Sequence, residues 1–299
     1  MEAIDNEFLL QDRLQKIRSM NELYDLEHNA YLSFSGGKDS TVLHYLLDEA
    51  LPGNKIPRVY LNTGIEYKMV VSFVERERDY SRFVIIKPEQ NIRAILETNG
   101  YPFKSKEHSH YLAVYQHSGM TKTNYKYLGY GEKETKFVCP KCLKYQFTEE
   151  FKLKVSDKCC YKLKKDVAHK WAEENNRLIV LTGMRADEGG LRANHACTVF
   201  ENGSLIKFHP LMPLNNDFIE WYIKRRNIQL CELYYSPYNF QRTGCKGCPY
   251  SLDLQKQLDI MAVLLPEEKK QCEMIWAPVY AEYRRLGYRL RSNEQLELF

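Results

Sequence analysis

The sequence contains no apolar run close to the roughly 20 residues that a membrane-spanning helix requires. Its N-terminal stretch, MEAIDNEFLLQDRLQKI, is too acidic and too often interrupted by polar residues for a signal peptide. Internal repeats and low-complexity tracts are also missing. We therefore expect a cytoplasmic protein that has no membrane partner.

Its composition is that of an ordinary globular protein. Charged residues make up 27% and hydrophobic residues 44% of the 299 positions, enough for one large domain or two smaller ones. In a reducing cytoplasm, the 9 cysteines are expected to be thiols, metal ligands or redox groups and not a disulfide framework.

The net charge of +4 is distributed unevenly along the chain. Residues 103–170 hold 15 lysines, no arginine and 7 acidic residues, a local charge of +8 that leaves −4 for the remainder. A segment of this kind suits the phosphates of a polymer or of a nucleotide. A solvated lysine-rich face is the equally weighted alternative.

Two common phosphate-binding motifs are absent: the Walker A loop and the Gly-x-Gly-x-x-Gly turn. Instead, SGGKDS (residues 35–40) joins an apolar strand at 30–34 to an apolar helix that includes 41–47. Two successive glycines allow a sharp turn whose N–H groups face one concavity, and the helix N-terminus adds positive potential. The turn therefore predicts a site for a phosphate chain.

Strands and helices alternate along the chain. Further strands are expected from Arg58, Arg82 and Arg177, separated by helices at 66–80, 92–99 and 162–175. This order predicts a parallel sheet covered by helices on both faces, with ligands at the carboxyl ends of the strands. The fold class is thus α/β and Rossmann-like.

The domain plan has three parts: an N-terminal helix within 1–27, a nucleotide-binding domain at 28–214, and a small helical region at 215–299. A basic, Tyr-rich insertion at about 100–158, without a clean helix or strand period after Gly119, is expected over the active-site face. Two helices are expected at the end of the C-terminal region.

Four cysteines form two pairs, an adjacent pair and a Cys-x-x-Cys pair. They are Cys159, Cys160, Cys245 and Cys248. Four thiolates suffice for a 4Fe-4S cluster, and the lysines and arginine nearby favour thiolates. Zinc is the alternative, because Cys139 and Cys142 form half of a zinc ribbon that Cys245 and Cys248 would complete.

For Cys139 and Cys142 three roles remain open: a small zinc site, a second redox pair, or a function at the cluster. The isolated Cys197, Cys231 and Cys272 are interpreted as buried structural thiols.

These motifs resemble those of a known family. SGGKDS resembles the pyrophosphate loop of the adenine nucleotide alpha-hydrolase superfamily, and CC…CxxC resembles the cluster motif of the phosphoadenosine phosphosulfate (PAPS) reductase family. NTGIEY (62–67) looks like the family's second nucleotide loop and TGMRADEGGLR (182–192) like its arginine loop. The resemblance covers about residues 30–250.

The resemblance implies roles for individual residues. Lys38, Asp39, Arg185 and Arg192 would be catalytic. The adenine nucleotide, ATP or a relative, would be bound by Ser35, Gly36, Gly37, Lys38, Asp39, Ser40, Asn62, Thr63, Gly64, Glu66 and Gly183. Asp39 would help to place Mg²⁺, and a further zinc ion at Cys139 and Cys142 remains one of the alternatives.

Two departures from the reductases bear on the activity. No cysteine follows Cys272, whereas the reductases carry a catalytic cysteine in a C-terminal tail, and the phosphate loop is intact, whereas theirs is usually degenerate. Both features favour an ATP pyrophosphatase that adenylates an acceptor for sulfur transfer. The alternatives are a sulfonucleotide reductase that uses Cys272 or the Cys139/Cys142 pair, and a non-catalytic, nucleotide-responsive iron-sulfur subunit.

The expected acceptor is a nucleic acid, with a sulfur donor such as a cysteine desulfurase. The insertion supports this choice because tyrosines alternate with lysines in it, an arrangement suited to base stacking beside positive charge. These residues are Tyr111, Tyr115, Tyr125, Tyr127, Tyr130, Lys122, Lys126 and Lys133. A lid over a small sulfonucleotide is the alternative role of this segment.

Overall fold

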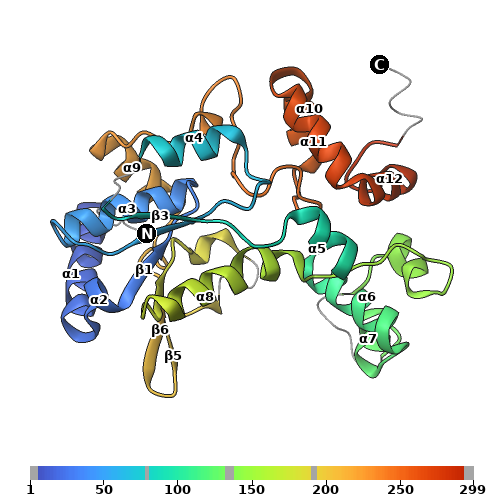
Figure 1. Ribbon diagram of the computed structural model, residues 1–299, viewed down its shortest axis with the longest axis horizontal. Helices are drawn as coiled ribbons and strands as arrows, with labels where there is room; N and C mark the ends of the chain where they lie inside the picture. Colours follow the sequence, from blue (N-terminus) through green and yellow to red (C-terminus); the bar gives the residue numbers. More distant parts are fainter. Residues whose placement is uncertain (1–5, 78–80, 132–137, 190–193, 293–299) are drawn as a thin grey trace, which may run out of the picture. The chain divides into compact units, whose positions relative to one another are not determined.

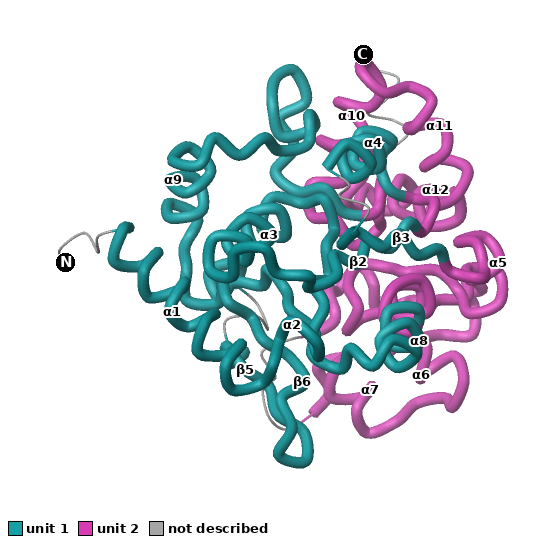
Figure 2. The backbone as a smooth tube through the Cα atoms, turned by 60° about the vertical axis from the view of Figure 1, so that its left-hand side comes forward, with its two compact units in different colours: residues 1–62, 66–87, 167–244 teal, residues 63–65, 88–166, 245–299 magenta. Residues whose placement is uncertain are grey.

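The computed structural model describes residues 6–77, 81–131, 138–189 and 194–292. The chain divides into two compact units (Figure 2). The first unit comprises residues 1–62, 66–87 and 167–244, and the second comprises 63–65, 88–166 and 245–299.

The first unit contains a six-stranded sheet with the order β3-β2-β1-β4-β6-β5. Its strands are β1 (Ala30–Ser33), β2 (Arg58–Leu61), β3 (Phe83–Ile86), β4 (Ile179–Leu181), β5 (Thr198–Glu201) and β6 (Ser204–Phe208). All neighbours are parallel except β5, which pairs antiparallel with β6. The predicted Rossmann-like parallel sheet is confirmed, with an antiparallel strand at one edge.

Helices cover both faces of this sheet, and the alternation of side chains along β1 explains how (Figure 1). Tyr31 packs edge-on against Trp171 of α8 (Asp166–Glu174), with ring centroids 5.4 Å apart. Phe34, just after the strand, packs against His44 of α3 (Lys38–Ala50). Tyr31 and Phe34 therefore pack against helices on opposite faces of the sheet, as predicted.

The remaining helices of the first unit are α1 (Asn6–Tyr24), α2 (Leu26–Asn29), α4 (Lys68–Arg76) and α9 (Asn216–Arg226). The predicted N-terminal helix is confirmed as α1, which packs against α3 and buries Leu10 and Leu14. α9 begins where the Asn215 side chain accepts a hydrogen bond from the Phe218 N–H. It also packs against α3, so α3 is supported from two sides.

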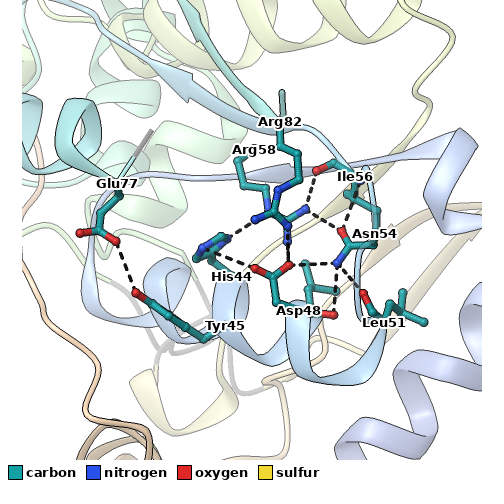
Figure 3. Close-up of polar contacts among 10 residues, drawn as sticks. His44, Tyr45, Asp48, Leu51, Asn54, Ile56, Arg58, Glu77 and Arg82 are labelled. Atoms are coloured by element: carbon teal, nitrogen blue, oxygen red, sulfur yellow. Dashed lines mark hydrogen bonds and ion pairs between the residues drawn. The ribbon is translucent and has the colours of Figure 1, made fainter. Parts of the chain in front are cut away.

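A buried polar network fastens α3 to the start of β2 (Figure 3). The fully buried Arg58 donates to His44 Nδ1 at 3.0 Å and forms an ion pair of 2.6 Å with Asp48. Burial opposes ionisation of Asp48, but the guanidinium groups of Arg82 and Arg58 hold its pKa below the ordinary value. These hydrogen bonds and the ion pair offset the cost of burying the Arg58 charge. They also connect α3 to the start of β2.

The β5–β6 hairpin is absent from the predicted elements. Its turn is formed by Asn202 and Gly203, whose φ angles are 48° and 80°. Asn-Gly between two alternating apolar segments is a strong hairpin signal, because both turn residues need positive φ. The segment FENGSL (residues 200–205) therefore predicts this hairpin.

The second unit is mainly helical. It contains α5 (Ile92–Asn99), α6 (Lys106–Ser118), α7 (Lys122–Tyr127), α10 (Leu254–Leu264), α11 (Pro266–Ile275) and α12 (Ala277–Leu286), with a 3₁₀-helix at Lys141–Phe147 and a π-helix at Tyr161–Lys165. The prediction of no regular structure after Gly119 is wrong, since α7 follows an N-cap at Thr121. After the Cys245–Cys248 pair the chain forms three helices, α10 to α12, where two were expected. No helix within the described ranges is long and apolar enough to cross a bilayer.

Candidate functional site

The SGGKDS loop connects β1 to α3 in the first unit. Gly36 has φ of +69°, and a Cβ atom there would lie 3.0 Å from the side chains of both Val70 and Val74 of α4. Only glycine suits both the left-handed backbone and this close approach. The turn is therefore tightly held against α4.

Three backbone N–H groups of the loop donate hydrogen bonds to hydroxyl oxygens. The Ser35 N–H donates to Ser40 Oγ at 3.2 Å, and the Gly37 N–H donates to Ser35 Oγ at 3.3 Å. The Lys38 N–H donates to the Tyr234 hydroxyl at 2.9 Å. These donors lie at the N-terminus of a 13-residue helix, where anions are favoured.

A cavity of about 760 Å³ opens beside this loop. It lies where β1 and β4 end, with Ser33 and Thr182 in its wall. The direction of strand succession reverses between β1 and β4, the place where open α/β sheets bind ligands. Seven residues of the predicted site line this cavity, namely Ser35, Gly37, Lys38, Asp39, Ser40, Gly183 and Arg185.

The two predicted loops approach each other closely at Gly183. A Cβ atom on this residue would lie 2.8 Å from the carbonyl carbon and oxygen of Asp39. Glycine is thus required for the end of β4 to reach the first turn of α3.

Asp39 and Arg185 form an ion pair in the cavity wall. Arg185 is only 6% exposed; it donates from Nε to Asp39 Oδ1 at 2.9 Å and from Nη1 to Asp187 Oδ2 at 2.6 Å. Burial raises the pKa of Asp39, and the positive charge of Arg185 opposes that rise. The carboxylate and the guanidinium therefore hold each other in a fixed position.

Several lining residues were not predicted. Asn216, at the start of α9, accepts a hydrogen bond from Lys38 Nζ at 2.9 Å and donates to Glu220 Oε1 at 2.6 Å. Tyr234, Arg242 and Thr243 also line the cavity. They are distant in sequence from the loop and carry no local motif, so pattern reading could not assign them.

Other predicted nucleotide residues lie elsewhere. Asn62 and Glu66 belong to the first unit but do not line the cavity, and Thr63 and Gly64 belong to the second unit. Arg192 lies outside the described residues. Their assignment to nucleotide binding stays a prediction.

The four paired cysteines all lie in the second unit. Cys159 donates a weak hydrogen bond to Cys160 Sγ at 4.0 Å, and the Cys248 N–H donates to the Cys245 carbonyl at 3.3 Å. Gly247, between the second pair, has φ of +61°, and a Cβ atom there would lie 2.7 Å from Cys272 Sγ. The Cys-x-x-Cys turn thus depends on glycine and on the buried Cys272 beneath it.

The sulfurs influence one another electrostatically. The hydrogen bond with Cys160, then burial, then the charges of the other three thiols raise the pKa of Cys159. The hydrogen bond from Cys159 lowers the pKa of Cys160 to about 6, against burial and with help from Lys106, Lys164 and Lys165. Burial, followed by the charge of Cys245, raises the pKa of Cys248 to about 12. The two pairs, far apart in sequence, thus lie in the same unit and influence each other's ionisation.

The four paired cysteines are the candidate metal ligands of the second unit. Within the described part of the chain, no three His, Cys, Asp or Glu side chains are placed to hold one metal ion. Sulfurs around one zinc must each lie about 2.3 Å from it, whereas a 4Fe-4S cluster takes one thiolate on each of four irons and so accepts a wider spacing. The thiols of the two pairs interact electrostatically, and Lys106, Lys164 and Lys165 act on Cys160.

Cys139 and Cys142 differ sharply in environment. Cys139 is buried, which raises the pKa of its thiol to about 11 although Lys104 and Lys144 oppose the rise. Cys142 is exposed. Cys231 and Cys272 are fully buried, as predicted, whereas Cys197 is half-buried.

The tyrosines of the insertion divide into two groups. Tyr125 and Tyr130 are 49% and 52% exposed, with ring centroids 5.3 Å apart, and Lys144 Nζ lies 4.6 Å from the Tyr130 ring. The prediction that Tyr127 is a stacking platform is wrong, because it is buried and its hydroxyl bonds His108 Nδ1 at 2.9 Å. Lys133 lies outside the described residues.

Three solved structures illustrate what the chain is similar to. A PAPS reductase from Candida auris in a phosphate complex shares 14% identity over 81% of this chain and 96% of its own, with a TM-score of 0.45. An FMN adenylyltransferase from Candida glabrata with FAD and inorganic pyrophosphate shares 14% identity over 79% and 62%, with a TM-score of 0.46. A U34-tRNA thiolase from Methanococcus maripaludis with its [4Fe-4S] cluster shares 16% identity over 94% and 80%, with a TM-score of 0.40.

No curated protein sequence matches the chain. The family described as "Phosphoadenosine phosphosulfate reductase domain" matches residues 29–251, which include the phosphate loop, the arginine loop and both cysteine pairs. The match covers most of the chain and agrees with the sheet order and the cavity at the ends of β1 and β4. The chain therefore belongs to the PAPS reductase family.

Proposed function

We propose that this protein cleaves ATP between the α and β phosphates and transfers the adenylyl group to an acceptor for sulfur transfer. In the first step an acceptor oxygen attacks the α phosphorus, and the bond to the β-phosphate oxygen breaks with release of pyrophosphate. In the second step a sulfur nucleophile displaces AMP from the activated acceptor. The observation that carries the proposal is that an intact SGGKDS loop and the Asp39–Arg185 pair share one cavity.

Each residue has a defined task in this proposal. The N–H groups of residues 35–40 and the ammonium group of Lys38 bind the β and γ phosphates. Arg185, together with Arg192, offsets negative charge that grows on the phosphates in the transition state. Asp39 helps to hold Mg²⁺, whose charge would neutralise the phosphates when bound. The loop of Asn62, Thr63, Gly64 and Glu66 is assigned to the nucleoside, as the family resemblance implies.

The four paired cysteines are proposed to hold a 4Fe-4S cluster. When bound, the cluster would carry or deliver the sulfur. Lys106, Lys164 and Lys165 favour the thiolate form of Cys160 and balance the negative charge of a thiolate-ligated cluster. A zinc ion at Cys139 and Cys142 remains an alternative and would need ligands beyond these two residues.

A nucleic acid is the proposed acceptor, with a cysteine desulfurase as the type of sulfur donor and the cytoplasm as the location. Exposed Tyr125 and Tyr130 beside Lys144 support this choice, since stacking surfaces next to cations suit single strands. The acceptor could be tested by incubating the protein with ATP, sulfide and short RNA or DNA strands and analysing the nucleosides for sulfur.

The reductase alternative has weaker support. It needs a reactive thiol, and Cys272 is fully buried with its pKa raised by burial to about 12. In the other candidate, the Cys139/Cys142 pair, Cys139 is also buried with a raised pKa, and only Cys142 is exposed. Sulfite released from adenylyl sulfate would favour the reductase, whereas AMP and pyrophosphate from ATP would favour our proposal. Tight nucleotide binding without turnover would favour a regulatory subunit.

A further inference from the structure

The phosphate loop receives one of its hydrogen-bond acceptors from a distant segment. Two of the three N–H groups described above donate to Ser35 and Ser40, which belong to the loop itself. The third, on Lys38, donates to the Tyr234 hydroxyl at 2.9 Å. This N–H is at the first position of α3, where no carbonyl of the helix is available to it.

Tyr234 is held firmly in this position. Its hydroxyl also pairs with Thr243 Oγ1 at 2.9 Å. The preceding residue, Leu233, is fully buried, and its carbonyl accepts from the Phe240 N–H at 2.8 Å. Both the backbone and the hydroxyl of Tyr234 are therefore anchored, and the contact with the loop is not a chance approach of a mobile side chain.

The hydroxyl lies against the glycine turn of the loop, where the proposed function places the phosphates. A Cβ atom on Gly37 would come within 3.4 Å of both Tyr234 Oη and Thr243 Oγ1, so these oxygens lie directly against the glycine turn. All three residues line the 760 Å³ cavity. The Lys38 ammonium group likewise already has an acceptor, because it donates a hydrogen bond to Asn216 Oδ1 at 2.9 Å.

A single N–H makes one good hydrogen bond, because its strength falls steeply when the donor angle departs from linearity. A phosphate oxygen that takes the Lys38 N–H must therefore replace the tyrosine hydroxyl. The exchange costs the free protein a hydrogen bond that it already has, so part of the binding free energy of the phosphate is cancelled.

We propose that Tyr234 lowers the phosphate affinity of the loop, because its hydroxyl competes with phosphate oxygens for the Lys38 N–H. It keeps the loop satisfied in the nucleotide-free protein and weakens the binding of free pyrophosphate, so that pyrophosphate leaves after each turnover. The ligand class is a di- or triphosphate chain. This inference rests on the proposed function in one respect, namely that phosphates bind at this loop.

The test is calorimetric titration of the full-length protein with inorganic pyrophosphate. Tyr234→Phe keeps the ring and removes only the competing oxygen, so we expect pyrophosphate to bind roughly three- to tenfold more tightly than to the wild type. Thr243→Val, which removes the partner of the hydroxyl, should tighten binding in the same direction but less. Tyr235→Phe is the matched control, because its hydroxyl accepts from the Leu230 N–H away from the cavity, and it should bind as the wild type does.

Unchanged or weaker pyrophosphate binding by Tyr234→Phe would overturn the inference, and weaker binding would identify the hydroxyl as a direct phosphate ligand. If Tyr234→Phe does not fold, Thr243→Val decides by the same criterion. No detectable pyrophosphate binding by the wild type or any variant also overturns it. Tighter binding by Tyr234→Phe in a protein that cleaves no ATP would support the inference and reject the proposed function.

Discussion

Arg185 donates a hydrogen bond from Nε to Asp39 Oδ1 at 2.9 Å and thereby ties the residues after β4 to the first turn of α3. These segments follow the two strands between which the direction of strand succession reverses. The pair also connects the two loops that the family resemblance implicates in phosphate binding. The charged groups are therefore positioned before any nucleotide arrives, which is the condition for electrostatic stabilisation of a transition state.

The pair predicts different effects for two neighbouring substitutions. Asp39→Ala removes one partner of the buried Arg185, so it should lower the free energy of unfolding by about 1–3 kcal/mol, with Asp187 limiting the loss. Lys38→Ala should leave the free energy of unfolding nearly unchanged, because the Lys38 side chain is only half-buried. Both should release far less pyrophosphate from ATP. Chemical denaturation would measure the first effect, and equal stability of the two variants would contradict this account of the pair.

The cysteine set predicts an iron content. Protein purified without oxygen should be brown and hold about four irons per chain, one for each thiolate. Cys159→Ser and Cys248→Ser should lose most of the iron and the visible absorbance, whereas Cys231→Ser, a buried thiol of the first unit, should retain both. Stoichiometric zinc without iron would show that the assignment is wrong.

His108 predicts a loss of stability in mild acid. It is fully buried between the Tyr127 hydroxyl and Gln146 Oε1, and burial lowers its pKa to about 4. The unfolded chain, with an ordinary pKa of about 6.5, takes up a proton first as the pH falls, so the free energy of unfolding decreases between about pH 6.5 and pH 4.

Between pH 7 and pH 5, His108 alone should lower the free energy of unfolding by about 2 kcal/mol. Urea denaturation at the two pH values would measure this decrease. His108→Gln should show a correspondingly smaller decrease over the same interval. A decrease as large as that of the wild type would mean that other groups, such as His209, whose pKa burial also lowers to about 4, are responsible.

The exposed tyrosines predict the strength and salt dependence of nucleic-acid binding. Tyr125→Ala combined with Tyr130→Ala should weaken binding of a single strand by roughly 1–3 kcal/mol per stacked base, without changing acceptor-independent ATP cleavage. The affinity should fall with salt at a log-log slope of about 0.7 per phosphate contact. Phe200→Ala on β5, where the ring is also 49% exposed, is the control and should bind normally. Damage to small-nucleotide turnover, with no strand bound at physiological salt, would instead indicate a lid.

Local patterns predicted the features that depend on neighbouring residues. Strands β1 to β4 and the glycine turn at Gly36 follow from short apolar runs and from backbone conformations that few residues adopt. The β5–β6 hairpin, which is not among the predicted elements, also has a local signal in the turn residues Asn202 and Gly203.

The exposure of individual side chains and the contacts between distant segments depend on tertiary packing. Tyr125 and Tyr127 are two positions apart in the same helix, yet one is exposed and the other is buried against His108. Asn216 and Tyr234 reach Lys38 from 178 and 196 residues away, so no local pattern could assign them to the site.

The most direct test of the proposed function is to identify the bond that the protein cleaves in ATP. With water in place of the acceptor, the anaerobically purified chain should convert ATP labelled at the α and γ phosphates into labelled AMP and labelled pyrophosphate in equal amounts. Lys38→Ala should abolish both products, and Lys256→Ala, an exposed lysine of α10, should abolish neither. Release of ADP and inorganic phosphate, or retention of ATP together with sulfite release from adenylyl sulfate, would contradict the proposal.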